Sequence, residues 1–362
     1  MNINIKNIRL KSICATLFIS LFLSCNNGIE ELQKQNQSIL SISNLRQNFL
    51  DVFASFGEMF TDTLGIKSDT KKSEIGKCFT KIIETMKTVK EQLTSEVVKN
   101  EHYSKVKKEV EKFVEKLVTI EKGAEEAFSG FKDSTGKLGD IKKAADSSTG
   151  ADATSVGNLV KGIRTIVEVV LEKEGDGTKD VTKATSNDKQ EIGKLFGDNT
   201  TNGGAEAKHI AAAGASIGAV TGADILKAIA NSSSDKVDVK AKEAKDAAGL
   251  AMAKCDSGGT TDLDSATKKD AVMSAGIALR AMAKGGNIFV KSADSGKDTE
   301  VGGAQGVAVS AVNKTLNTLI IAIRNTVDNG LRKINDVLAT VKQEDKSEDT
   351  TNTADITASG QK

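Results

Sequence analysis

Cys25 is the residue of this chain whose neighbours most clearly suggest a chemical reaction. It follows an uncharged, largely apolar run over residues 12–23, and Phe22-Leu23-Ser24 stand directly before it. A thiol can form the thioether that carries diacylglycerol, and a small residue at Ser24 lets a peptidase reach the bond before the cysteine. This is the arrangement of a bacterial lipoprotein box, with Phe22 where leucine is usual. It predicts S-diacylglycerol and N-acyl (palmitate-type) groups on Cys25, and the alternative is an ordinary signal that is cleaved nearby.

The residues before this cysteine have the pattern of a removed secretory signal. Lys6, Arg9 and Lys11 form a basic start, and the apolar run is shorter than the roughly 20 residues that a spanning helix needs. We therefore expect residues 1–24 to be a signal peptide and residues 25–38 to be an acylated N-terminus and polar tether. Removing three positive charges changes the formal net charge from +1 to −2, which gives no reason to expect a nucleic-acid partner.

The other reactive side chains lack the spacing of a catalytic or metal site. His102 and His209 have no second histidine, cysteine pair or HExxH frame nearby, and both are interpreted as structural or solvent-exposed. The segment "GDGTKD" at 175–180 lacks the alternating acids of a calcium loop. Cys78 and Cys255 lie far apart and are interpreted as two separate buried thiols in preference to one disulfide. We expect no enzyme activity, no cofactor and no metal.

The elements that carry these residues are predicted to be helices. The 362 residues include no proline, no tryptophan, one tyrosine and 12 phenylalanines. An interior proline costs about 3 kcal/mol in a helix and aromatic residues are enriched in strands, so this composition favours long helices over sheets. Apolar residues at three- and four-residue steps predict core-facing helices over residues 42–60, 75–97, 106–128 and 309–341. Asp69 is the predicted N-cap of the second of these helices.

The middle of the chain has a different character. Of the 32 glycines, 26 lie between residues 123 and 306, among clusters of Ser, Thr, Asp and Asn that are typical of loops. Shorter apolar patterns between these clusters predict short helices over residues 156–171, 192–196, 210–230, 241–253 and 266–290. Gly214, Gly218 and Gly222 have the four-residue spacing that lets two helix backbones approach closely. We expect this packing within a bundle and not across a membrane, because the uncharged run around them is short.

Together these patterns predict an all-α fold. We expect a single helical domain over residues 39–342, an elongated helical bundle in which the long N- and C-terminal helices form a membrane-proximal stem. Residues 123–306, with short helices and loops, are expected at the distal end, and residues 343–362 are expected to be a disordered polar tail. The loop-rich region is then the part of the molecule that faces outward.

Several separate blocks of the sequence resemble one family. They include "KSEIGKCFTKIIETMKTVKEQL", "SIGAVTGADILKAI" and "KKDAVMSAGIALRAMAKGGNIFVK". Over essentially its whole length the chain resembles the variable large proteins of relapsing-fever Borrelia and the related variable surface lipoprotein of Lyme spirochaetes. The resemblance implies an all-helical outer-surface lipoprotein, acylated at Cys25, whose distal loops differ between variants. It also implies a well-kept segment over residues 268–291 in which four apolar residues are largely buried: Val272, Ile277, Leu279 and Met282.

Together with the lipoprotein box and the lack of a catalytic motif, the resemblance implies a non-catalytic, lipid-anchored antigen at the cell surface, which serves immune evasion by antigenic variation. Its expected partners are the outer membrane and host antibodies. Surface loops can change at a cost of about 0.5 kcal/mol or less per substitution while buried contacts keep the fold. The alternative is an adhesin that binds host glycosaminoglycan or another host ligand through lysine-rich faces, at residues 104–117 or at Lys240, Lys242 and Lys245. Solvated helix surfaces with interleaved glutamates have the same composition.

Overall fold

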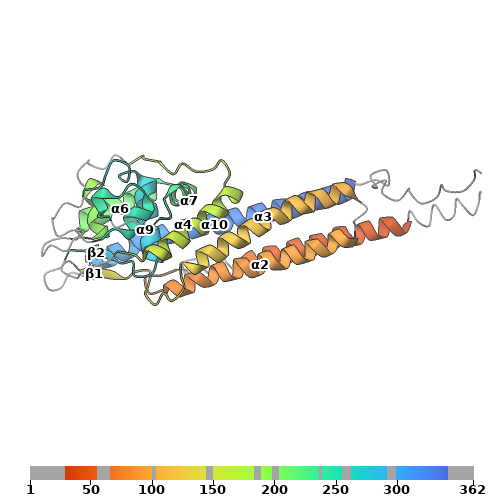
Figure 1. Cartoon of the computed structure of the whole chain (residues 1–362), viewed down its shortest axis with the longest axis horizontal. Coiled ribbons are helices and arrows are strands. Elements are labelled where there is room, and N and C mark those ends of the chain that lie inside the picture. Colours follow the sequence, from red (N-terminus) through yellow and green to blue (C-terminus); the bar gives the residue numbers. More distant parts are fainter. Residues whose placement is uncertain are drawn as a thin grey trace, which may run out of the picture. The chain divides into compact units, whose positions relative to one another are not determined.

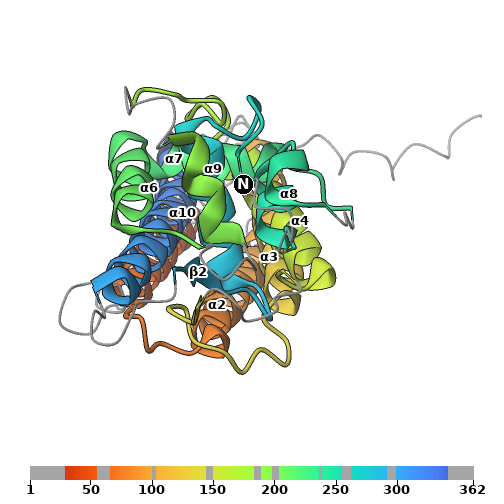
Figure 2. The same ribbon diagram turned by 90° about the vertical axis from the view of Figure 1, so that its left-hand side faces the viewer.

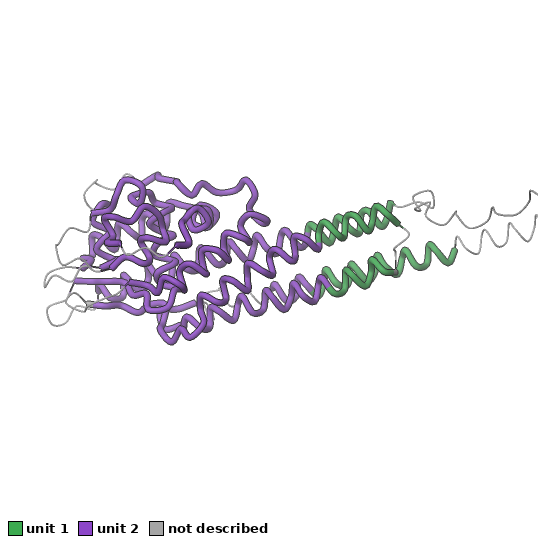
Figure 3. The backbone as a smooth tube through the Cα atoms, in the orientation of Figure 1, with its two compact units in different colours: residues 1–48, 91–113, 329–362 green, residues 49–90, 114–328 purple. Residues whose placement is uncertain are grey.

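The computed structural model describes residues 29–54, 66–99, 103–143, 150–182, 189–197, 204–235, 239–254, 262–291 and 299–340. The chain divides into two compact units (Figure 3). Unit 1 comprises residues 1–48, 91–113 and 329–362, and unit 2 comprises residues 49–90 and 114–328. The region predicted as a single helical domain over residues 39–342 therefore falls into two units, each of which buries its own apolar residues.

The described residues are mostly helical, which confirms the all-α prediction (Figure 1). A helix covers residues 29–54. The other long helices are α2 (Lys72–Lys99), α3 (Ser104–Ser129), α4 (Ala153–Val170) and α10 (Thr299–Thr340). The shorter ones are η1 (Glu191–Phe196), α6 (Ala207–Ala219), α7 (Gly222–Asn231), η2 (Ala241–Glu243), α8 (Ala247–Met252) and α9 (Asp270–Met282). Two short strands, β1 (Ile141–Lys143) and β2 (Ile288–Val290), pair in parallel with Ile141 opposite Ile288.

The apolar periodicity located the long helices well. In α2 the buried positions recur from Ile75 to Leu93, and in α10 they recur from Val312 to Leu338 at the predicted spacing. Two residues placed on apolar stripes are instead exposed, namely Val52 and Phe128, each 41% accessible. The apolar stripe of an amphipathic helix is wide, so residues at its edge fit the three- and four-residue spacing and can still be exposed to solvent.

The predicted polar tether over residues 25–38 overlaps a helix: residues 29–38 belong to the helix over residues 29–54. Its polar side chains have helical partners, since Glu30 pairs with Lys34 one turn later at 3.1 Å. Asp69 lies in a turn and does not cap α2; the helix begins at Lys72, and Glu74 accepts from the Lys71 N–H at 3.2 Å.

Unit 1 is built from the beginning of the 29–54 helix and from the adjoining ends of α2, α3 and α10. Its buried residues include Leu45, Leu93, Val110 and Leu331. Polar side chains also link its helices: Tyr103 Oη donates to Glu31 at 2.8 Å, Ser41 Oγ donates to Glu96 at 2.9 Å, and Asn335 donates to Ser43 at 2.9 Å. Burial and the bond to Glu31 raise the pKa of Tyr103 to about 12. These bonds explain why the polar start of the chain's first described helix is ordered.

In unit 2, helix α9 is surrounded by other elements (Figure 2). It contacts α4, α6, α7, α8 and β2, and all of its residues are buried. Small residues allow this dense packing around it. A Cβ on Gly276, for example, would lie 2.9 Å from the Cβ of Leu250 in α8.

Helices α3 and α4 cross at very short range. A Cβ on Gly123 of α3 would lie 2.7 Å from the side chain of Ile166, and a Cβ on Gly130 would lie 2.8 Å from that of Leu159. On α4, a Cβ on Gly162 would lie 2.7 Å from the Cα of Ala127. Glycine is therefore required here by close approach of two backbones and not by an unusual φ.

The predicted helix over residues 210–230 is in fact two helices. Helices α6 and α7 meet at an angle of 101°. Thr221 and Asp224 form a capping box that starts α7, and this local signal ends the first helix. The expected close-packing stripe is therefore interrupted: a Cβ on Gly218 would meet nothing within 4 Å, whereas one on Gly222 would collide with Thr318 of α10.

Among the described helices, α10 alone is long and apolar enough to cross a membrane, and the bent pair α6–α7 would be a second candidate if counted as one span. Of the most apolar window of α10, 56% is buried inside the protein. Core helices of folded domains have the same length and composition, so this finding does not indicate a membrane span.

Candidate functional site

Several residues singled out in the sequence lie outside the described part of the chain. These are Cys25 with the signal peptide over residues 1–24, His102, Cys255 and the tail over residues 343–362. Acylation of Cys25 therefore stays a prediction.

Cys78 lies on the buried face of α2, as the apolar pattern predicted. It is 2% exposed, and burial raises the pKa of its thiol to about 11. A thiol that is protonated at neutral pH and closed off from solvent is a poor nucleophile and a poor metal ligand. Cys78 therefore behaves as a small apolar residue of the core.

The segment over residues 268–291 is the most buried part of the described chain. Val272, Ile277, Leu279 and Met282 are all buried, which confirms the expectation from the family resemblance. Four charged residues at or against this segment are buried as well, and the apolar patterns did not identify them: Lys72, Lys189, Asp270 and Arg280. The one signal available was a single arginine inside the otherwise apolar run "AVMSAGIALRAM".

Arg280 is fully buried and binds backbone carbonyl groups. Its Nη1 donates to the oxygens of Ala251 and Ala253 at 3.0 and 2.8 Å, at the C-terminus of α8. Its Nε donates to the Asn287 oxygen at 2.6 Å, just before β2. A cation at a helix C-terminus also meets the negative end of the helix dipole. The guanidinium lies 5.9 Å from the ring centres of both Phe196 and Phe289, so it joins η1, α8 and β2.

Lys72 binds the turn between α9 and β2, close to the Asn287 oxygen that Arg280 binds. Its Nζ donates to the carbonyl oxygens of Ala283 and Gly286 at 2.7 and 2.6 Å. Burial lowers the pKa of Lys72 to about 8, while nearby Asp140 opposes this effect and Arg280 adds to it. Two buried cations thus fix the turn between α9 and β2 from different directions.

Asp270, the first residue of α9, is buried at the other end of that helix. Its carboxylate accepts from the N–H groups of Val181 and Thr182, both at 2.7 Å, and from Thr182 Oγ1 at 2.6 Å. Lys189 Nζ lies 2.8 Å away. Burial opposes ionisation of this carboxyl, but these donors outweigh it and lower the pKa of Asp270 to about 2.

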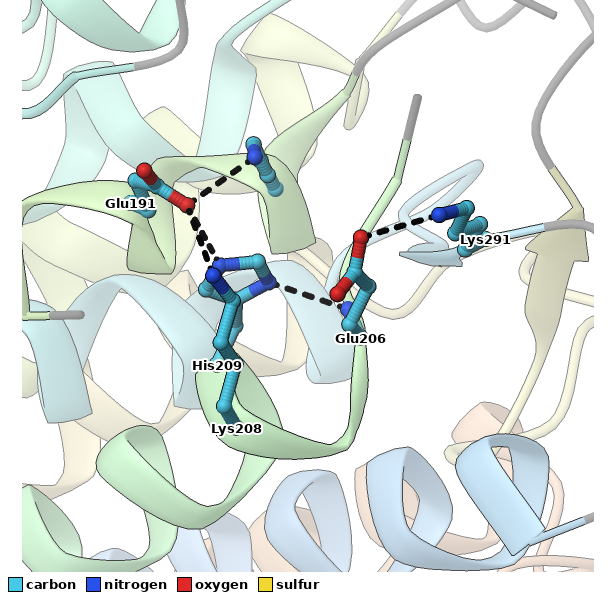
Figure 4. Close-up of polar contacts among 6 residues, drawn as sticks. Glu191, Glu206, Lys208, His209 and Lys291 are labelled. Carbon is cyan, nitrogen blue, oxygen red and sulfur yellow. Dashed lines mark hydrogen bonds and ion pairs between the residues drawn. The ribbon is translucent and has the colours of Figure 1, made fainter. Parts of the chain in front are cut away.

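His209 is the centre of a second polar cluster (Figure 4). The ring is fully buried near the start of α6, between Glu191 of η1 and Glu206. The Glu206 N–H donates to Nδ1 at 3.0 Å, so the neutral ring carries its proton on Nε2 and donates to Glu191 Oε2 at 2.6 Å. Lys291 pairs with Glu206 at 3.0 Å. The structural interpretation of this histidine is confirmed, and it links η1 to α6.

We expect the His209 cluster to weaken the fold in mild acid. Burial lowers the pKa of His209 below its ordinary value of about 6.5, with Glu191 opposing and the lysines Lys194 and Lys208 adding to the shift. Between the two pKa values the unfolded chain binds a proton that the folded chain does not, so stability falls as pH drops below about 6.5. The melting temperature of the wild type should therefore fall more between pH 7.5 and 5 than that of His209→Gln, which lacks the titrating ring.

The control for this comparison is Lys208→Gln, which removes an exposed neighbour and keeps the buried ring. Its pH profile should resemble that of the wild type. Equal pH profiles for the wild type and His209→Gln would show that the ring does not link stability to pH.

The described residues offer no group of three or more His, Cys, Asp or Glu side chains that could hold a metal ion. The buried cations Lys72 and Arg280 bind backbone carbonyl groups, and the buried carboxylate of Asp270 binds backbone N–H groups and Lys189. Of the lysines proposed for host-ligand binding, Lys116 pairs with Glu172 at 3.5 Å and Lys245 pairs with Asp264 at 2.6 Å.

Comparison with known proteins gives the class of this protein. The chain belongs to the Borrelia lipoprotein family, whose sequence profile matches residues 49–338. It is similar over nearly its full length to Variable large protein 17 of Borrelia hermsii, with 51% identity over 98% of both chains. Variable large protein 4 of the same organism is 48% identical over 98% of this chain and 99% of its own. Variable large protein 19 is 34% identical over 91% of this chain and 93% of its own.

A solved structure supports the same assignment. The crystal structure of the Lyme disease variable surface antigen VlsE of Borrelia burgdorferi matches with a TM-score of 0.66 and 32% sequence identity. The match covers 82% of this chain and 97% of that chain. The family resemblance and the helical fold predicted from the sequence are thereby confirmed.

Proposed function

We propose that this protein is a non-catalytic antigen, anchored by lipid at Cys25 to the outer membrane, exposed at the cell surface and used for immune evasion by antigenic variation. One observation carries the proposal: three differently numbered variable large proteins of one organism align with nearly all of this chain, yet differ from it at about half or more of the aligned positions. Many versions of one fold are what a switching surface antigen requires.

The physical chemistry of the described residues supports this role. Stability comes from buried apolar residues and from buried charges such as Arg280 and Asp270. Antibodies bind exposed residues, where most substitutions change stability by about 0.5 kcal/mol or less. The antigenic surface can therefore change while the buried contacts remain.

The decisive experiment is protease digestion of intact cells, followed by mass spectrometry of released and retained peptides. The proposal expects release of peptides from residues 123–306, while an acylated fragment that begins at Cys25 stays with the cells. A chain that is untouched until the outer membrane is broken would face the periplasm, and antigenic variation could not be its role.

Cys25→Ser should abolish lipid attachment, because a hydroxyl cannot replace the thiol in the thioether. We expect a precursor that retains residues 1–24 and carries no labelled palmitate. Cys14→Ser, within the apolar run, is the control and should be labelled like the wild type. Palmitate labelling of Cys25→Ser would show that this cysteine is not the acylated residue.

The second candidate function is adhesion to a sulfated host polysaccharide. Lys105, Lys108 and Lys112 are exposed on α3 at spacings of three and four residues, which places them on one helix face. The pairing of Lys116 and Lys245 with acidic residues weakens the candidate. Adhesion requires retention on heparin that falls steeply with salt and is lost on charge reversal of these three lysines. Passage through the column at low salt would exclude it.

A further inference from the structure

The helix over residues 29–54 has an exposed apolar face at its start. Ile29, Leu32 and Leu40 are 57%, 59% and 63% exposed, and together with Asn36 they recur at three- and four-residue steps along one face. The buried residues of this helix, such as Ile42, lie on the opposite side. Large apolar side chains are therefore held on the face that points away from the core of unit 1.

No charged residue belongs to this face between residues 29 and 40. Glu30, Glu31 and Lys34 are the charged residues of the stretch, and at about 100° per residue they lie on other sides of the helix. Glu30 pairs with Lys34 at 3.1 Å, and Glu31 accepts from Tyr103. A helix surface that faces water usually carries charged side chains, so this face is suited to a less polar neighbour.

The start of the helix also extends beyond the other helices of unit 1 (Figure 1, red). Ser41 bonds to Glu96 at 2.9 Å, close to the end of α2 at Lys99. The turns that carry Ile29 and Leu32 run past that end. These two side chains thus lie at the tip of unit 1, where the helix is free to meet another surface.

The covalent chain limits how far this tip can lie from the predicted lipid anchor. Residues 26–28 separate Cys25 from Ile29, and four Cα steps of about 3.6 Å span about 14 Å at most. The acyl chains predicted on Cys25 would lie in the hydrocarbon core, which is covered by a headgroup layer roughly 5–8 Å thick. Ile29 is therefore held close to this layer, whereas Leu40 lies about 16.5 Å further along the helix.

We propose that Ile29 and Leu32 insert into the headgroup layer of the bilayer that holds the acyl chains of Cys25, while Leu40 stays outside it. The inference rests on the proposed lipid anchor and adds a direct contact between side chains and lipid. Apolar side chains of an amphipathic helix enter about 5–10 Å into the boundary between headgroups and acyl chains. The stretch has no cluster of positive charges, so the surface that it fits is zwitterionic and not specifically anionic.

The experiment places single tryptophans in the acylated mature chain, bound to phosphatidylcholine vesicles. The chain has no tryptophan, so Ile29→Trp, Leu32→Trp and Leu40→Trp each contain one indole. Vesicle-bound protein is isolated by flotation, and its fluorescence is compared in ordinary lipid and in lipid brominated on the upper part of one acyl chain. Leu40→Trp is the matched control, because the residue lies on the same face of the same helix and is similarly exposed.

In Ile29→Trp and Leu32→Trp, vesicle binding should shift the emission to the blue, and brominated lipid should quench it about twofold or more, because the indole lies at the depth of the bromines. In Leu40→Trp neither change should occur. Adding Ile29→Ser to Leu32→Trp should weaken the quenching, because the native isoleucine then no longer holds the helix start in lipid. Added salt should leave the quenching unchanged, since the contact is apolar.

Three outcomes would overturn the proposal. One is equal quenching in Ile29→Trp and Leu40→Trp, and another is vesicle-bound protein in which none of the three indoles is quenched. The third is a blue shift that appears without vesicles and grows with protein concentration, because the face would then bind a second copy of the chain. Failure of the lipid anchor gives a different result, since the wild type itself would not float with the vesicles.

Discussion

Arg280→Met is expected to destabilise unit 2 by about 3–5 kcal/mol, because several buried carbonyl oxygens lose their hydrogen-bond donor at once. The carbonyl oxygens of Ala251, Ala253 and Asn287 would lose their donor and stay in the interior. Each buried acceptor without a donor costs about 1–3 kcal/mol. Methionine fills much of the volume of arginine but supplies no donor, so the loss is one of hydrogen bonding and not of packing.

Arg280→Lys should restore little of this stability. The guanidinium reaches α8 and the residue before β2 at the same time, because its donors diverge in one plane. An ammonium group is a compact donor at the end of a flexible chain, and it cannot serve both places with the same geometry. We therefore expect the free energy of unfolding of Arg280→Lys to be closer to that of Arg280→Met than to that of the wild type.

The measurement is urea unfolding followed by far-UV circular dichroism, with Arg164→Met as the matched control. Arg164 also binds backbone carbonyls, donating to the Ala230 oxygen at 2.6 Å, but it is only partly buried. Water can replace the hydrogen bonds of Arg164, so we expect Arg164→Met to lower the free energy of unfolding by about 1 kcal/mol. If Arg280→Met lowers the free energy of unfolding no more than Arg164→Met does, the buried hydrogen bonds of Arg280 do not stabilise unit 2 as we expect.

Local patterns predicted much of this fold. The long helices were found because their buried faces recur every three or four residues, as in α2 from Ile75 to Leu93. The break between α6 and α7 also has a local signature, since Thr221 and Asp224 have the spacing of a capping box. That signal is present in the sequence, but the apolar pattern over residues 210–230 does not show it.

The missed features depend on partners that are distant in sequence. The helix beginning at residue 29 is polar, but Glu31 meets Tyr103 and Gln35 bonds to the Leu338 oxygen. Arg280 binds carbonyl groups, which every residue has, so no side-chain pattern identifies its partners. A lone charge in an apolar run shows that a partner must exist, but the tertiary structure is needed to locate it.

Gly162→Ala is expected to destabilise the protein, because α3 and α4 cross so closely at this residue that there is no room for the methyl group of alanine. The added Cβ would lie 2.7 Å from the Cα of Ala127 and would also collide with the Ala127 nitrogen and the Gly123 oxygen. These are backbone atoms of a packed helix, so they cannot yield as the end of a flexible side chain can. Overpacking of this kind costs about 1–3 kcal/mol, and we expect the upper part of that range.

The sign of this effect separates packing from helix propensity. Alanine is favoured over glycine in a helix interior by about 1 kcal/mol, so propensity alone predicts that Gly162→Ala stabilises the protein. Gly218→Ala, in α6, is the matched control, because its new Cβ would meet nothing within 4 Å. We expect urea unfolding to show stabilisation at Gly218 and destabilisation at Gly162. If both substitutions stabilise, α3 and α4 do not approach as closely as the structure places them, and glycine at 162 is not required by packing.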